Sequence, residues 1–253
     1  MINIKSKSEI EKMKAAGKIV SEVLALMEEH ILPGISTKEL DRIAGNHIIK
    51  SGAFPSFKGQ PNFYGGPAFP ATLCASVNHE VIHGIPNEKP LREGDIVSID
   101  VGACYDGYHG DAARTFPVGK CSEAALQLIN VTRQSFFEGI QFAVPGHRII
   151  DISGAIQDYA EGYGYSIVRD YTGHGIGREL HEDPEVPNYR GRVRGYRLQP
   201  GMAIAVEPMV NAGGYGVYVK PNKWTVCTKD GSLSAHYENT VIVTDGEPLL
   251  TTL

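Results

Sequence analysis

Two stretches of the 253-residue sequence share one residue pattern, and each ends in an acidic residue. Residues 91–100 read LREGDIVSID, and residues 198–207 read LQPGMAIAVE. Each begins with Leu-x-x-Gly, continues through a mostly apolar stretch, and ends in a carboxylate, Asp100 or Glu207. Self-similarity of this kind indicates a repeated structural unit that presents one acid in each copy.

A second pair of acids repeats in the same order. His109-Gly-Asp111 matches His236-Tyr-Glu238, and each motif continues for eight residues to a glycine. The two halves of the chain therefore offer four carboxylates in corresponding places. Carboxylates that converge in this way could hold metal ions.

The segment between Asp100 and Asp111 predicts a hairpin. Asp106-Gly107 is a two-residue turn signal, because both residues tolerate positive φ. With that turn, the expected pairs are Tyr105 with Tyr108, Gly102 with Asp111 and Asp100 with Ala113. Side chains of paired residues share a face, so the two acids become diagonal neighbours, roughly 7–8 Å apart at the backbone.

Four acids around one axis would repel one another unless cations lay between them. Burying them without cations would be prohibitively costly, so two divalent ions are predicted. His174, in the glycine-rich motif YTGHGIG, is the best-placed further ligand. Oxygen ligands with one imidazole suit Mn, Fe(II), Co or Zn, and two such ions about 3.5–4 Å apart form a hydrolytic unit.

Ordinary structural explanations compete with this interpretation. Asp100 and Asp111 could lie on a solvated hairpin, and an isolated His174 could be a buried core residue. The matching positions of Glu207 and Glu238 favour the metal site over both alternatives.

Helical periodicity gives the elements that must position these acids. Apolar residues recur at three- and four-residue steps over residues 10–31 and, less cleanly, 128–140. A Pro-Gly pair follows each run, and a second helix is expected over residues 40–47 and 152–160, with Gly52 and Gly164 as stops. Each half is then expected to contain two helices followed by strands. This order predicts an α/β (α+β) fold in which a pseudo-two-fold axis relates the halves.

The halves are expected to form one fused domain over residues 1–253. They cover residues 8–119 and 120–250, and no Ser/Gly-rich linker separates them. Net charge is −5, with acidic and basic residues mixed, which argues against a nucleic-acid partner. No apolar run approaches the roughly 18–20 residues that span a bilayer. Without an export signal, a cytoplasmic location is expected.

Five separated motifs resemble those of the type I methionine aminopeptidases. They lie between about Ser8 and Leu250, in the order of that family, and read SVNHEVIHGIP, GDIVSIDVGACYDGYHGDAARTF, TGHGIGRELHEDP, GMAIAVEPM and WTVCTKDGSLSAHYENTVIVT. The resemblance implies the pita-bread fold, a curved antiparallel sheet flanked by helices. It also implies removal of N-terminal methionine from nascent proteins and peptides with small second residues.

The resemblance assigns roles to individual residues. It implies that five residues bind two metal ions: Asp100, Asp111, His174, Glu207 and Glu238. Attack by a hydroxide bridging the ions is implied, with Glu207 assisting proton transfer. His83 resembles the histidine near the scissile amide nitrogen and His181 the one that steadies the carbonyl oxygen. An oxyanion donor and a proton source are needed in any such reaction.

The remaining implications concern the pocket and the partners. Positions of the methionine pocket correspond to Phe69, Cys74, Leu180 and Trp224, and a monovalent cation is implied near Asn78 and Ser234. The expected partner is a peptide or nascent-chain N-terminus. The chain resembles the short bacterial form, which we expect to be a monomer with at most a transient ribosome contact. One departure is the segment from Lys58 to Phe69, which is longer than in the family and borders the pocket.

Two other functions stay open at this point. Another pita-bread enzyme could cleave Xaa-Pro bonds as an aminopeptidase or dipeptidase, although such enzymes usually carry a large N-terminal domain. A pita-bread protein that has lost its metals could be a non-catalytic binding module. Retention of all five proposed ligands argues against the second.

Overall fold

Helix pairs occur in both halves of the chain. The computed structural model describes residues 2–62 and 65–253. Within these residues the four helices are α1 (Lys7–His30), α2 (Thr37–Lys50), α3 (Glu123–Ile140) and α4 (Ile149–Gly162). The repeated helix pairs expected from the periodicity are therefore confirmed.

Strands fill the rest of each half. In the first half they are β1 (Phe54–Pro55), β2 (Leu73–Val77), β3 (Glu80–Ile82), β4 (Ile96–Tyr105) and β5 (Tyr108–Pro117). In the second half they are β6 (Ser166–Ile167), β7 (Gly173–Gly175), β8 (Glu182–Val186), β9 (Ala203–Val206), β10 (Met209–Asn211), β11 (Val217–Val219), β12 (Val226–Thr228), β13 (Ser234–His236), β14 (Asn239–Ile242) and β15 (Leu249–Leu250).

Glycine ends the second helix of each half, as expected. Gly52 follows α2 with φ 76°, and Gly164 follows α4 with φ 83°. The next residue in each case bonds back to the helix, Ala53 to the Ile48 carbonyl and Tyr165 to the Ala160 carbonyl. These six-to-one bonds define the glycine-terminated helix end known as the Schellman motif.

Strands β4 and β5 form the predicted hairpin. Tyr105 pairs with Tyr108, Gly102 with Asp111 and Asp100 with Ala113, which confirms the expected register. The turn residues Asp106 and Gly107 have φ of 48° and 77°. Both values are positive, as the two-residue turn requires.

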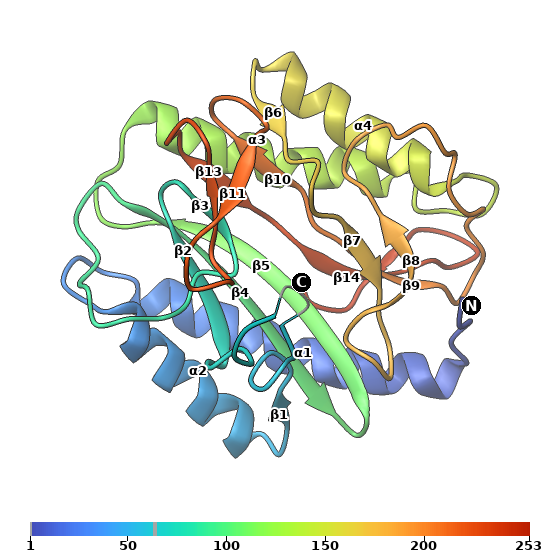
Figure 1. Cartoon of the computed structure of the whole chain (residues 1–253). Coiled ribbons are helices and arrows are strands. Elements are labelled where there is room, and N and C mark those ends of the chain that lie inside the picture. The colour runs from blue at the N-terminus through green and yellow to red at the C-terminus, as the bar shows by residue number, and fades with distance from the viewer. Residues whose placement is uncertain (1, 63–64) are drawn as a thin grey trace.

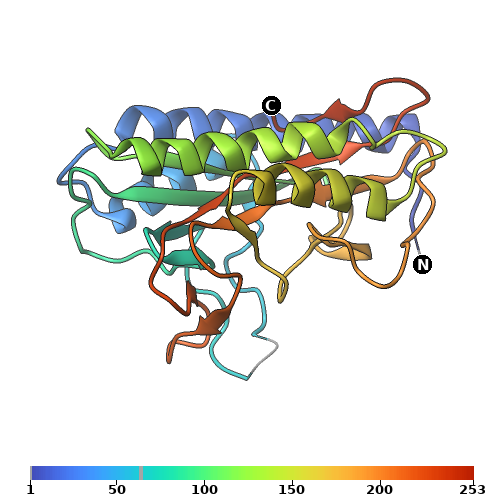
Figure 2. The ribbon, with the colours of Figure 1, turned by 90° about the horizontal axis from the view of Figure 1, so that it is seen from above.

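Antiparallel ladders connect the strands. One sheet has the order β1-β4-β2 with β5 beside β4, and another has the order β15-β14-β9-β7-β8. Two three-stranded sheets, β13-β10-β6 and β11-β12-β3, complete the arrangement. Figure 1 shows the long β4–β5 hairpin crossing the middle of the molecule, and Figure 2 shows the helices on one side of the strands.

The two halves meet where β5 lies beside residues 236–240. Ala113 and Glu238 exchange backbone hydrogen bonds, with N···O distances of 2.9 and 3.4 Å. On either side of this pair, the side-chain hydroxyl of a threonine takes the place of a backbone hydrogen-bond partner. The Thr240 hydroxyl accepts from the Asp111 N–H and donates to its carbonyl, both at 3.0 Å. Thr115 does the same for His236, at 2.8 and 2.9 Å.

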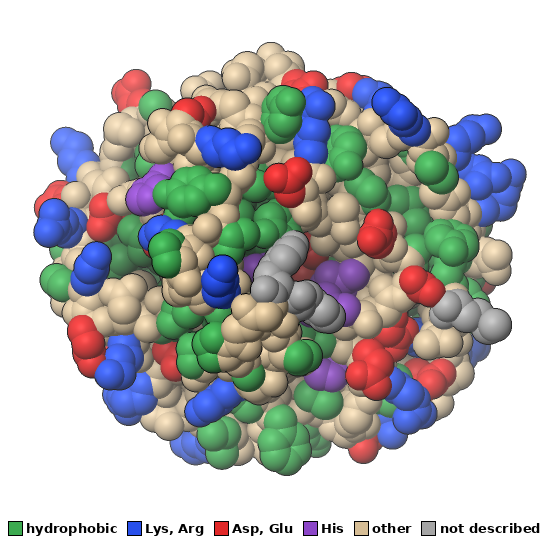
Figure 3. Space-filling model, viewed as in Figure 1, with side chains coloured by type: hydrophobic (Ala, Val, Ile, Leu, Met, Phe, Trp, Pro, Cys, Tyr) green, Lys and Arg blue, Asp and Glu red, His purple; other side chains and the backbone are tan. Residues whose placement is uncertain are grey.

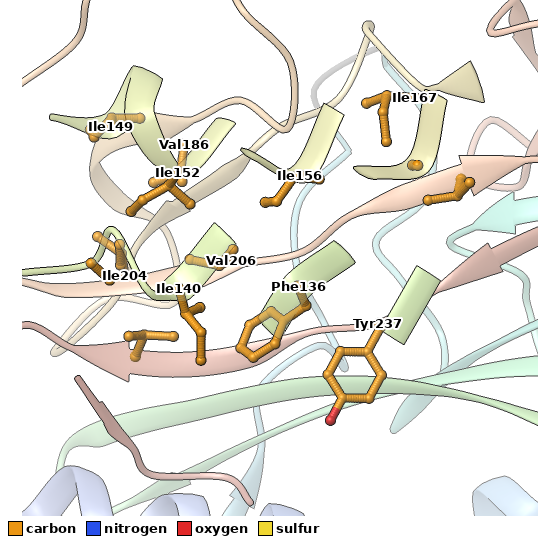
Figure 4. Close-up of a cluster of buried hydrophobic side chains, with 14 of the residues drawn as sticks. Phe136, Ile140, Ile149, Ile152, Ile156, Ile167, Val186, Ile204, Val206 and Tyr237 are labelled. Atoms are coloured by element: carbon orange, nitrogen blue, oxygen red, sulfur yellow. The ribbon is translucent and has the colours of Figure 1, made fainter. Parts of the chain in front are cut away.

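Each helix pair packs on the strands of its own half. Beneath α3 and α4, Phe136, Ile152 and Ile156 are fully buried against strand residues such as Ile204 and Val206 (Figure 4). A second cluster lies between the first helix pair and β2, β4 and β5. It contains Val97, Ile99 and Val101, all fully buried, so the apolar face of β4 is anchored in the core.

Among the helices of residues 2–62 and 65–253, none combines the length and the apolar character needed to cross a bilayer.

Candidate metal centre and substrate pocket

A cavity of about 270 Å³ is lined by residues of β4, β5 and β7 and of the loops near them. In Figure 3, histidine side chains gather in the middle of the face that is drawn. Every residue proposed above for the metal site or the methionine pocket contributes to its lining: Phe69, Cys74, His83, Asp100, Asp111, His174, Leu180, His181, Glu207, Trp224 and Glu238. The structure therefore brings together residues from widely separated motifs.

Adjacent strands carry the acids to this cavity. Asp100 lies on β4 and Asp111 on β5, facing the same side because of the hairpin register. Glu207 directly follows β9, and Glu238 lies between β13 and β14. Glu238 exchanges backbone bonds with Ala113 of β5, so the seam between the halves fixes its distance from the hairpin acids.

Glycine on both sides lets His174 enter a crowded strand. A Cβ at Gly173 would lie 2.3 Å from the Ala205 carbonyl oxygen, and one at Gly175 would lie 2.1 Å from that of Asp183. His174 Nδ1 lies 2.8 Å from the Gly175 carbonyl oxygen. An N–H at Nδ1 in this position leaves Nε2 as the free lone pair, and Nε2 is 3.6 Å from Glu207 Oε1.

Burial and mutual repulsion shift the acids toward their protonated forms. Burial raises the pKa of Asp100 to about 7, although a hydrogen bond with Asp111 opposes the rise. For Asp111, burial and then the charges of Glu238 and Asp100 raise the pKa well above its usual range. Burial followed by neighbouring acids does the same for Glu207 and Glu238. Divalent cations would remove this penalty.

Several buried atoms of the cluster have no hydrogen-bond partner in the part of the chain that the structure describes. They include Asp100 Oδ1, Asp111 Oδ1 and Glu238 Oε1. Ligand atoms of Asp111, His174 and Glu238 lie within 4.8 Å of one another. Hard carboxylate oxygens with a neutral imidazole form a donor set that fits a first-row divalent metal.

His83 sits above the acids in a constrained turn. Its φ is 57°, and a Cβ on Gly84 would lie 2.1 Å from the Ala75 carbonyl oxygen. Burial, and then the charge of His181, lower the pKa of His83 to about 4. His83 is therefore neutral near pH 7, and one of its ring nitrogens can donate while the other accepts.

Aromatic rings form the apolar wall. Phe69 and Trp224 meet edge to face with ring centroids 5.1 Å apart. The Trp224 indole N–H donates to the Pro67 carbonyl at 2.9 Å. The longer segment from Lys58 to Phe69 thus lies against this wall, and its Phe63 and Tyr64 fall outside the described residues.

Asn78 and Ser234 lie together but outside this cavity. Ser234 N–H donates to the Asn78 carbonyl at 2.9 Å. The Asn78 amide is already bound by structural partners, Asp95 and the N–H of Ile96. The monovalent cation expected there stays a prediction.

The site also contains residues that were not predicted from the sequence, among them Tyr171 and His236. Tyr171 lines the cavity, with its ring centroid 5.9 Å from that of His83. His236 lies within reach of Glu207 and Glu238. Both stand in motifs already singled out, YTGHG and HYE. The aligned His109 of the other half could have drawn attention to His236.

This chain is similar to known proteins over nearly its whole length. The model of metallopeptidase family M24 matches residues 11–245. The methionine aminopeptidase of Clostridium acetobutylicum is 56% identical, covering 100% of this chain and 99% of the relative. Methionine aminopeptidase 1 of Bacillus subtilis is 49% identical over 97% of this chain and 96% of its own.

The structural comparison agrees with the sequence comparison. The crystal structure of methionine aminopeptidase from Rickettsia prowazekii superposes with a TM-score of 0.94 at 44% identity, covering 100% of both chains. The pita-bread fold expected from the motifs is thereby confirmed. The chain belongs to metallopeptidase family M24 and, within it, to the methionine aminopeptidases.

Proposed function

We propose that this protein removes the N-terminal methionine from nascent proteins and peptides with small second residues, using two divalent ions. The observation that carries the proposal is that the five proposed metal ligands line one cavity beside an apolar wall. Identity of 44–56% to methionine aminopeptidases over the whole chain supports this activity over the Xaa-Pro alternative.

The residues that would hold the two ions are Asp100, Asp111, His174, Glu207 and Glu238. Their unpartnered buried oxygens support this assignment. Two such ions would lower the pKa of a water and polarise the peptide carbonyl. Mn, Fe(II), Co or Zn fits the donor set.

Side chains around the cluster would transfer protons and stabilise the charge that develops during the reaction. Glu207, whose pKa is raised by burial, would take a proton from the attacking water and return it to the leaving amine. His83 would hydrogen-bond near the scissile nitrogen. His181, with its ring 4.4 Å from that of His174, would donate to the carbonyl oxygen as charge develops.

Phe69, Cys74, Leu180 and Trp224 would bind the methionine side chain. Cys74 and Leu180 are buried, and Phe69 is only 3% exposed. Sulfur makes favourable contacts with aromatic rings, which supports a thioether beside the Phe69–Trp224 pair. A charged or β-branched side chain would fill this narrow apolar site poorly.

We also keep the finer proposals made from the sequence. They are a monovalent cation near Asn78 and Ser234, a monomeric protein, a transient ribosome contact and a cytoplasmic location. None of these is needed for the proposed reaction.

Peptide cleavage after reconstitution with each candidate metal tests the function. We expect release of methionine from Met-Ala and Met-Gly peptides. Acetylation of the α-amine should lower kcat/KM at least about a hundredfold, because a contact worth several kcal/mol would be lost. Equal rates on acetylated and free peptides would contradict an aminopeptidase.

The same panel separates the alternatives. Cleavage confined to Xaa-Pro peptides would favour the dipeptidase or aminopeptidase P activity. A purified protein that binds no metal and stays inert with added Mn or Co would favour the non-catalytic binding protein.

A further inference from the structure

His236 is a buried histidine whose ring nitrogens are both unpartnered. It ends β13, and only 1% of its surface is exposed. Neither Nδ1 nor Nε2 has a hydrogen-bond partner among the described residues. An imidazole buried without partners loses its hydration and gains no hydrogen bond in return. A bound ion would give one of these ring nitrogens a partner.

Distances around His236 match those of atoms that share an ion. Its Nε2 is 3.8 Å from Glu207 Oε2 and 3.9 Å from Glu238 Oε2. Both distances are too long for hydrogen bonds. Two ligand atoms bound to one ion at about 2.1 Å can be up to about 4.2 Å apart. The His174–Glu207 distance of 3.6 Å is of the same kind.

The geometry therefore places two imidazoles around Glu207, one facing each carboxylate oxygen. His174 Nε2 faces Oε1, and His236 Nε2 faces Oε2. Ligand atoms of Glu207, His236 and Glu238 lie within 4.8 Å of one another, as do those of Asp111, His174 and Glu238. Glu238 belongs to both groups.

We propose that His236 is a further metal ligand, which binds an ion together with Glu207 and Glu238. This inference rests on the proposed function, because it assumes that the acid cluster holds divalent ions. It changes the donor set from one imidazole to two. Imidazole favours Co, Fe(II) and Zn more than Mn, so His236 would bias the site toward the former.

Two variants and one spectroscopic count test the proposal. In His236→Gln the imidazole is removed and a polar side chain is kept. The matched control is His47→Gln, because His47 lies on α2 and pairs with Glu22, away from the cavity. Equilibrium dialysis with Co(II) and with Mn(II) gives stoichiometry and affinity. Proton NMR of the Co(II)-loaded protein counts the exchangeable imidazole N–H resonances with the large contact shifts of a ring bonded to the paramagnetic ion, which the unbound rings of His83 and His181 in the same cavity would lack.

Two shifted N–H resonances are expected in the wild type and in His47→Gln, and one in His236→Gln. Co(II) affinity should fall at least about tenfold in His236→Gln, with a smaller loss for Mn(II). A single shifted resonance in the wild type, or an unchanged spectrum and affinity in His236→Gln, would overturn the proposal.

The wild-type measurement separates this inference from the proposed function. A wild type that binds Co(II) but shows one shifted N–H keeps the proposed function and removes His236 from the ligand set. A wild type that binds no Co(II) in dialysis overturns both. If His236→Gln fails to fold, the wild-type count alone decides.

Discussion

Individual side chains of the cluster have protonation equilibria that differ from those in water. The four acids favour protons because they are buried together. His174 is kept neutral, because burial lowers its pKa to about 3. A neutral imidazole and acids that lose protons on binding form a site whose metal affinity depends on pH.

Replacing Asp111 by Asn tests the proposed role of Asp111 as a metal ligand. We expect at least one ion to be lost and kcat/KM to fall by about a thousandfold or more, because the ions supply several kcal/mol of transition-state stabilisation. The fold should survive, since the change removes one of several repelling charges. Metal analysis, peptide assays and circular dichroism give the three readouts. Wild-type turnover in Asp111→Asn would mean that catalysis occurs elsewhere.

Proton release provides the pH test. Acids with raised pKa values hold protons more strongly in the metal-free protein: burial raises the pKa of Asp100 to about 7, and burial and neighbouring acids raise the pKa of Glu207 well above its usual range. Metal binding must displace these protons, whereas neutral His174 has none to lose. Affinity should therefore rise with pH, by about tenfold per pH unit for each proton released. Calorimetry at about pH 6 and 8, in buffers of different ionisation enthalpy, measures the metal affinity and the number of protons released. A metal affinity independent of pH would contradict the raised pKa values of the acids.

Secondary-structure elements determine where these side chains point. The β4–β5 hairpin sets the spacing of two acids, and the glycines of β7 admit His174 between β8 and β9. Side-chain hydroxyls of Thr115 and Thr240 complete the seam between β5 and the segment that carries Glu238. Small changes at these contacts should therefore alter the positions of the proposed metal ligands.

Gly175→Ala tests the position of β7. Its Cβ would lie 2.1 Å from a backbone oxygen, so strands must separate. We expect a loss of about 2–4 kcal/mol in unfolding free energy and weaker metal binding, because His174 moves. Gly162→Ala is the control, since nothing lies within 4 Å of its Cβ on helix α4. Denaturant unfolding checks both; equal stabilities would show that β7 adapts without strain.

Thr240→Val tests the seam between the halves. The variant leaves the Asp111 N–H and carbonyl without their buried partner, which should cost about 1–3 kcal/mol. Thr132→Val is the matched control, because that buried hydroxyl bonds only a carbonyl of its own helix. Chemical denaturation of the two variants should give the larger loss for Thr240. The reverse order would mean that the seam is held by other contacts.

At the scale of the whole molecule, we propose a single domain with halves near residues 8–119 and 120–250. Three contacts that join the first half to the rest of the chain support this. Strand β3 pairs with β12 of the other half. Trp224 packs on Phe69. The C-terminal Thr251 lies so close to α1 that a Cβ at Gly17 would be 2.1 Å from its carbonyl oxygen.

One cooperative transition is the expected consequence. In metal-free protein, Trp224 fluorescence reports the pocket between the halves and far-ultraviolet circular dichroism reports the whole backbone. A single domain should give the same denaturant midpoint with both probes. Added Co(II) should raise that midpoint, because ions bind the folded chain preferentially. Separate transitions would show that the halves unfold independently.

Local chemistry in the sequence was sufficient for several features. Periodicity and the glycines at 52 and 164 gave the helix pairs and their ends. The Asp106-Gly107 turn gave the register that brings Asp100 and Asp111 to one face. These features depend on residues close together in the chain, where turn and helix preferences act directly.

Only the tertiary structure decided the contacts between distant segments. It showed Thr115 and Thr240 bridging the halves, Trp224 bonded to the Pro67 carbonyl, and His236 facing Glu207. Such contacts depend on how loops of unequal length pack, and no periodicity or turn rule encodes that packing. The repeated acids could be read from the sequence, but their closeness in one cavity needed the folded chain.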